Sequence, residues 1–142
     1  MGGVAPRTRC TSPLTDAEVD ARLPVWCALS ELFVDTAFDD TAADAVARVL
    51  RDSGLPLAEL DRILRDDVAP VFHRNAFAGH WTGWAPAEVR RAVMAHLAAA
   101  DRPVARLVRP LAPLLHRLRM GGFSVAWAQV RARLQEPAAP PR

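Results

Sequence analysis

Hydrophobic residues recur along this chain at intervals of three and four positions, which is the period of an amphipathic α-helix. No stretch shows the alternation of apolar and polar residues that a half-buried strand would need. We therefore predict an all-α fold, a compact single-domain bundle of about five to seven helices around one core. The predicted core includes four large side chains: Trp26, Phe33, Leu64 and Leu111.

Start and stop signals divide this pattern into helices. Thr15 and Glu18 have the spacing of a capping box, so a short helix is predicted to start there and to end before Pro24, where a second begins. One later helix is predicted to end at Ala69, because the residue before a proline such as Pro70 disfavours the helical conformation. The other helices are predicted to begin at Thr41 (as N-cap), Leu57, Pro86, Arg102 and Phe123.

The segment Arg102–Arg119 has the strongest amphipathic pattern. Its apolar residues fall within one arc of about 120° on a helical wheel. They are Val104, Leu107, Val108, Leu111, Leu114, Leu115 and Leu118. We expect this stripe to pack on the core, with a kink or break at Pro110 and Pro113. Four basic side chains opposite the stripe become candidate partner-binding residues: Arg102, Arg106, Arg109 and Arg117.

Charge is divided unevenly between the two halves of the chain. Residues 1–89 hold 8 Arg and 14 Asp plus Glu, a balance of −6, whereas residues 90–142 hold 10 Arg and 2 acidic residues, a balance of +8. We therefore predict a helical domain over residues 14–135, made of an acidic body (14–89) and a basic arm (90–135). Residues 1–13 and 136–142 are predicted to be a flexible N-terminus and a disordered tail. The arm should dock on the body or on an acidic partner.

A long segment without helical pattern, Pro70–Ala85, contains His80, Trp81 and Trp84. Long loops inside a compact domain are often functional, which makes these three residues candidates for partner binding. Large aromatic side chains that close the core over a loop are commoner than aromatic binding platforms, and we favour the core role.

Four acidic residues are candidates for a cluster. Glu31 and Asp35 lie four apart, so one helix would place both carboxylates on one face, and Asp66 and Asp67 would join them if the helices cross. A solvated helix edge is the better interpretation of the first pair. Asp66 and Asp67 are unfavourable near a helix C-terminus, and an internal ion pair with Arg74, His73 or an arginine of the basic arm is the expected compensation.

Several segments together resemble a known family. They are Arg22–Trp26, Leu29–Phe33, Asp35–Thr36, Leu57–Leu60, Asp67–Val71 and Trp81–Trp84, with a looser match from Trp127 to Leu134. This order is similar to a family of small bacterial proteins of unknown function, the one numbered 7079. The resemblance implies a compact, mostly helical domain and no particular activity. The chain departs from the family pattern at Pro56 and Asp66.

These observations favour some classes of function over others. No catalytic residues, no metal site and no cofactor site are predicted, because the four histidines have no zinc-ligand spacing and Cys10 and Cys27 look like free thiols. No apolar run is long enough to cross a membrane, and we expect a cytoplasmic protein. The leading hypothesis is a non-enzymatic protein-binding module such as a regulator, adaptor or toxin-immunity protein. The alternatives are a nucleic-acid-binding protein that uses the arginine face of residues 90–119 and, third, a metal-dependent enzyme with the acidic cluster.

Overall fold

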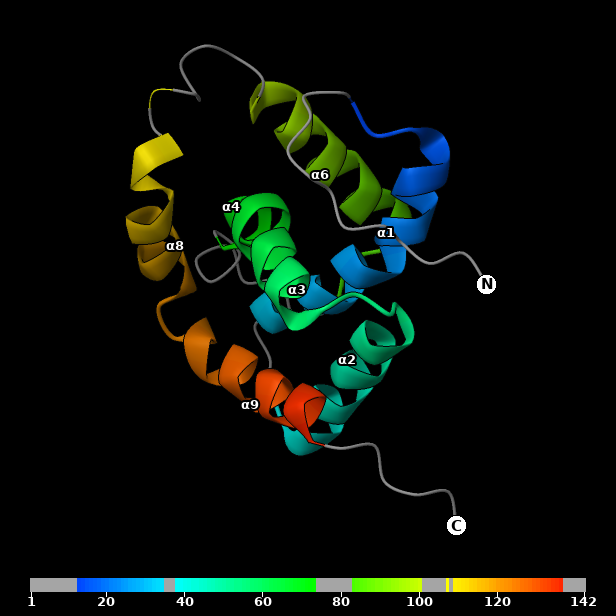
Figure 1. Cartoon of the computed structure of the whole chain (residues 1–142), viewed down its shortest axis with the longest axis vertical. Coiled ribbons are helices and arrows are strands. Elements are labelled where there is room, and N and C mark those ends of the chain that lie inside the picture. Colours follow the sequence, from blue (N-terminus) through cyan, green and yellow to red (C-terminus); the bar gives the residue numbers. More distant parts are fainter. Residues whose placement is uncertain (1–12, 35–37, 74–82, 101–106, 108, 137–142) are drawn as a thin grey trace.

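The fold is all-α, as predicted, in a computed structural model that describes residues 13–34, 38–73, 83–100, 107 and 109–136 (Figure 1). Within these ranges the chain contains helices and turns and no β-strand. Much of the Pro70–Ala85 loop lies outside the described residues, and so do both chain ends.

The first helix, α1 (Asp16–Ser30), begins at the predicted capping box. The Thr15 hydroxyl accepts a hydrogen bond from the Glu18 amide at 3.2 Å, and the Glu18 carboxylate accepts one from the Thr15 amide at 2.8 Å. The predicted end before Pro24 is wrong, because α1 runs through that proline as one helix. Pro24 has no N–H to donate to the Asp20 carbonyl four residues earlier. Both residues are exposed, so water can hydrate that carbonyl.

The next helix is α2 (Asp40–Asp52), which follows the 3-10 turn η1 (Glu31–Phe33). Its N-cap is Asp39 rather than the predicted Thr41, and the Asp39 carboxylate accepts a hydrogen bond from the Ala42 amide at 2.8 Å. The buried face consists of Ala43, Val46, Ala47 and Leu50. After the helix, Gly54 has a φ of +71°, a conformation that favours glycine.

Three consecutive segments form the centre of the molecule: α3 (Leu57–Ile63), the π-helical turn η2 (Leu64–Val68) and α4 (Ala69–Phe72). The predicted end at Ala69 is wrong, because the helical path continues through Pro70. The wider π turn accommodates the proline, and Ala69 N–H bonds to the Leu64 carbonyl five residues back. Pro70 has no N–H to donate to the Asp66 carbonyl. That carbonyl instead accepts a hydrogen bond of 2.9 Å from Nε2 of His96.

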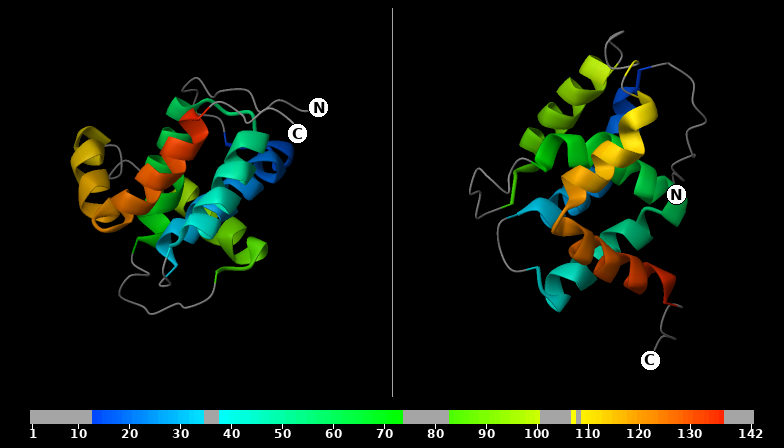
Figure 2. Two further views of the ribbon diagram at one scale, coloured as in Figure 1. Left: turned by 90° about the horizontal axis from the view of Figure 1, so that it is seen from below. Right: turned by 90° about the vertical axis from the view of Figure 1, so that its left-hand side faces the viewer.

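The remaining helices surround this centre (Figures 1 and 2). Helix α6 (Pro86–Ala100) packs along α1, and α9 (Phe123–Gln135) packs along α2. Between them lie the 3-10 turn η3 (Arg109–Leu111) and α8 (Ala112–Met120), at the edge of the molecule beside α4. Pro110 lies in η3 and Pro113 in the first turn of α8, so a 3-10 turn precedes the helix and the predicted break occurs at the prolines. Gly121, with a φ of +40°, ends α8 and allows the corner into α9.

One hydrophobic core joins the acidic body to the basic arm. It includes Trp26, Phe33 and Leu64, as predicted, together with Val93 of α6 and Val130 of α9. The prediction for Leu111 is wrong, because that side chain is 51% exposed.

Candidate functional site

Ion pairs join two helices of the basic arm to the acidic body. Arg90 of α6 lies 3.2 Å from Asp20 of α1, and Arg131 of α9 lies 3.6 Å from Asp61 of α3. Arg133 of α9 pairs with Asp40 and Asp44 of α2. Part of the positive charge of the arm is therefore paired with the body inside the chain.

Of the four arginines that the sequence singled out, only Arg117 has a side chain within the described residues. Arg102, Arg106 and the side chain of Arg109 lie outside the described residues. Arg117, on α8, is exposed. Sequence reasoning chose arginines by their position on a helical wheel, whereas the pairing arginines are those whose helices lie beside α1, α2 or α3.

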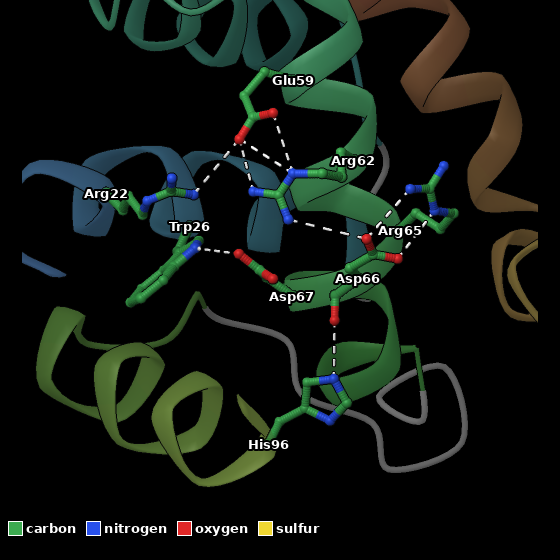
Figure 3. A network of polar contacts seen from close by, with 8 residues as sticks. All are labelled: Arg22, Trp26, Glu59, Arg62, Arg65, Asp66, Asp67 and His96. Carbon is green, nitrogen blue, oxygen red and sulfur yellow. Dashed lines mark hydrogen bonds and ion pairs between the residues drawn. The ribbon is translucent and has the colours of Figure 1, made fainter. Parts of the chain in front are cut away.

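A network of charged side chains lies where α1 crosses the central segment (Figure 3). Glu59 of α3 receives a hydrogen bond of 2.7 Å from Nη2 of Arg62, and its Oε1 lies 3.8 Å from Nη1 of Arg22. Both Arg22 and Glu59 are buried. This arrangement compensates two charges that would be costly to leave alone inside the protein.

Asp66 and Asp67 belong to the same network. Arg65 donates two hydrogen bonds to the Asp66 carboxylate, at 3.0 and 3.2 Å. The indole N–H of Trp26 donates one to Asp67 at 3.2 Å. Burial raises the pKa of Asp67 above its ordinary value, although the Arg62 charge and the Trp26 hydrogen bond act in the opposite direction.

The expected internal compensation of Asp66 and Asp67 is therefore present. Its described partners are Arg62, Arg65 and Trp26, whereas the predicted Arg74 lies outside the described residues. His73 instead contacts the Ala69 carbonyl, at 2.8 Å. The premise was also wrong, because the helical path continues to Phe72 and the two acids do not sit at a helix end.

Of the other acidic pair, only Glu31 is described, and it lies beyond the end of α1. Helix α1 ends at Ser30, Glu31 lies in η1, and Val34 is already extended, while Asp35 lies outside the described residues. The Glu31 carboxylate lies against Gly83, where an added Cβ would come within 2.5 Å of Oε1. Partial burial raises the pKa of Glu31. Among the described residues, no group of three or more His, Cys, Asp or Glu side chains is arranged to hold a metal ion.

The described end of the long loop meets the core. Trp84 packs on Phe72 with ring centroids 4.6 Å apart and planes inclined at 51°. This contact covers the core edge beside α4, which is the role that we favoured for this residue. His80 and Trp81 lie outside the described residues.

The feature that sequence reasoning missed is the orientation of α8. Leu111, Leu114 and Leu118, here called the leucine row, are 51, 55 and 71% exposed, and Leu107 is exposed as well. The predicted packing of this stripe on the core is therefore wrong. The less exposed side chains of α8 are Leu115, His116, Arg119 and Met120. The sequence showed the row clearly but carried no signal for its direction.

The inner face of α8 has both apolar and polar side chains, and its polar part approaches the charged part of the central segment. His116 is close enough to Arg65, Asp66 and Asp61 to feel their charges. Its pKa is lowered, first by burial and then by Arg65, and its Nδ1 is buried without a hydrogen-bond partner within the described structure. Only Met120, at the last turn, is fully buried from this helix.

Comparison with known proteins assigns a family but no activity. A family model described as a domain of unknown function (DUF7079) matches residues 20–133. The chain belongs to this family, in agreement with the resemblance seen in its sequence. No curated protein and no solved structure shows significant similarity to the chain. In the described part of the chain, no helix is long and apolar enough to cross a membrane.

Proposed function

We propose that this chain is a non-enzymatic, protein-binding module of a bacterium, of the regulator, adaptor or toxin-immunity type, and that it acts in the cytoplasm. The observation that carries the proposal is the exposed leucine row on η3 and α8. Rows of neighbouring apolar side chains on a surface mark interaction sites more often than scattered ones do. Complete burial of a leucine is worth about 1.5–3 kcal/mol, so a partner that covers three of them gains a substantial part of its affinity there.

The buried polar network supports a structural role better than a chemical one. Its carboxylates are bound by arginine and tryptophan side chains from α1, α3 and η2, and these contacts use oxygens that a metal ion or a substrate would need. The π turn, a feature often found at functional sites, follows here from Pro70. A metal-dependent enzyme consequently has the least support among the three classes.

Nucleic-acid binding is the second candidate, favoured by one observation. From Arg102 to Gln135 the chain has seven arginines and no acidic residue. Two of them, Arg131 and Arg133, already pair with aspartates of the acidic body, and the outer face of α8 offers leucines where phosphate would need cations. This surface therefore suits a protein partner better than a nucleic acid.

A pull-down from the native host tests the proposal. The bait is the full chain, compared with a double variant carrying Leu114→Glu and Leu118→Glu. Val49→Glu is the matched control, because Val49 is also a partly exposed apolar residue but lies on α2, away from α8. We expect a discrete protein that the wild type and the control retain at moderate salt and the double variant loses.

Two results would count against this function. Equal capture of every protein by the three baits would mean that the leucine row binds no partner. Co-purification of nucleic acid, seen in the absorbance ratio and lost steeply between about 50 and 200 mM salt, would favour the second candidate. The three baits should have similar circular dichroism spectra, since each substitution lies on the surface.

A further inference from the structure

We infer that the leucine row binds an acidic amphipathic helix of another protein. This inference rests on the proposed protein-binding function and adds the chemistry of the partner. The surface that carries it consists of Leu111, Leu114 and Leu118, extended at one end by Leu107 and flanked by Arg117.

The spacing of the row selects a helix as the partner. Positions 107, 111, 114 and 118 are separated by four, three and four residues, which is the spacing of a coiled-coil seam. Leu114 and Leu118 lie one turn apart on the same side of α8, and Leu111 precedes them in η3, so the exposed leucines form a narrow ridge rather than a broad patch. A ridge of this kind fits between the side chains of a second helix lying alongside it at a small crossing angle. An extended strand, whose side chains alternate between two faces, matches such a ridge poorly.

The charge beside the row selects an acidic partner. The stretch from Arg102 to Met120, which contains the row, has five arginines and no acidic residue. On the helical wheel of α8, Arg117 lies next to the row and is exposed. Acidic residues on the flanks of an incoming helix would complement this side chain, much as charged flanking positions set partner choice in coiled coils.

The same charge argues against a second copy of this chain as the occupant. A symmetric pair would bring the row of one copy onto the row of the other. Their basic flanks would then face each other, and like charges across an interface oppose association. An anionic lipid surface is also less suitable, because His116 and Arg119 of α8 turn inward and no aromatic residue lies in the row.

Two synthetic peptides test the chemistry of the partner directly. Both are helical, about three heptads long, with leucine at the two seam positions of each heptad. One has glutamate at the flanking positions and the other has lysine. Binding to the full chain is followed by fluorescence anisotropy of labelled peptide at about 100 mM salt, where charge effects remain measurable.

We expect the glutamate peptide to bind at least tenfold more tightly than the lysine peptide. The Leu114→Glu, Leu118→Glu double variant should lose at least tenfold in affinity for it, and Val49→Glu should not change the affinity. Arg117→Glu should lower the affinity for the glutamate peptide and raise the affinity for the lysine peptide. Loss of folding cannot produce such a reversal.

Several outcomes would overturn the inference. These are equal affinity for the two peptides, no binding of either, or no effect of the double variant. A concentration-dependent dimer that the double variant abolishes would assign the row to a second copy, and co-sedimentation with anionic phosphatidylglycerol vesicles would assign it to lipid. If the native partner depends on the row but neither peptide binds, the proposed function stands and the acidic helix is wrong. If the peptides bind but no native protein depends on the row, it is the proposed function that fails.

Discussion

Helices α8 and α9 follow one another in the basic arm. Helix α9 turns its large apolar side chains toward the acidic body, whereas α8 turns its leucine row away from it. Helix α9 buries Trp127 and Val130, and its Phe123 ring lies 4.8 Å from that of Phe33. Helix α8 leaves its leucine row in solvent and places His116 and Arg119 toward the body. Amphipathic pattern alone therefore does not decide which face of a helix is buried.

The difference arises from what each helix meets. Helix α9 lies along α2 and η1, where apolar side chains form the contact. At the edge of this contact, aspartates of α3 and α2 form ion pairs with Arg131 and Arg133. Helix α8 lies beside α4 and near the charged side chains of η2. A face of leucines against Arg65 and Asp66 would remove charged groups from water without replacing their interactions.

Truncation of one apolar side chain on each helix gives the largest expected contrast. Trp127→Ala should lower the free energy of unfolding by about 3–5 kcal/mol, because it leaves a cavity in the core and removes the hydrogen bond of 2.9 Å to Asp61. Leu118→Ala should change it by about 0.5 kcal/mol or less, since that side chain is mostly exposed. Urea titration followed by circular dichroism measures both. A large loss for Leu118→Ala would show that the leucine row is buried in solution.

The buried network under α1 offers a second, smaller test. Glu59→Ala should cost about 3 kcal/mol, because it removes the buried carboxylate that pairs with both Arg22 and Arg62. Asp20→Ala breaks a comparable arginine pair at an exposed position and should cost about 1 kcal/mol or less. The same urea titrations apply. Similar losses in the two variants would mean that burial does not distinguish the network from the pairs that hold the basic arm.

Asp61 joins the two helices, since it accepts a hydrogen bond from Trp127 and forms an ion pair with Arg131 of α9, and its charge acts on His116 of α8. Asp61→Ala should cost about 1–3 kcal/mol, mainly because the Trp127 N–H loses its acceptor. Asp61→Asn keeps an acceptor oxygen and should cost less than half of that amount. If both variants lose the same stability, the charge of Asp61 is what matters and the hydrogen bond is secondary.

The smallest expected effect concerns pH and His116. Its pKa in the folded chain is lowered, so below its ordinary value of 6.5 the unfolded chain binds more protons and stability falls as pH falls. His116→Gln should remove this contribution, which is about 1 kcal/mol or less because solvent screens a half-exposed group. The free energies of unfolding of the two proteins, measured from pH 7.5 to pH 5, should therefore diverge toward the acidic end, where only the wild type loses this contribution. Parallel curves would mean that α8 does not hold His116 in this environment.

Part of the candidate site was visible in the sequence. The leucine row and Arg117 stand out on a helical wheel, and the two prolines predicted the break before α8. The direction of the row could not be found in the same way, because it depends on Asp61, Arg65 and Asp66, which lie some fifty positions earlier in the chain. The glycine at position 121 marked the corner but not the side toward which the next helix turns.

The sequence by itself determined the helical class of this protein, the capping box at Thr15 and the family to which the chain belongs. These are properties of spacing and local hydrogen bonding, which act over a few residues. Tertiary structure decided that Pro24 and Pro70 stay inside continuous helical paths, that His96 serves the Asp66 carbonyl, and that α8 faces its leucines outward. Each of these depends on a surface supplied by a distant part of the chain, and the free energy of packing against that surface outweighs the local preference.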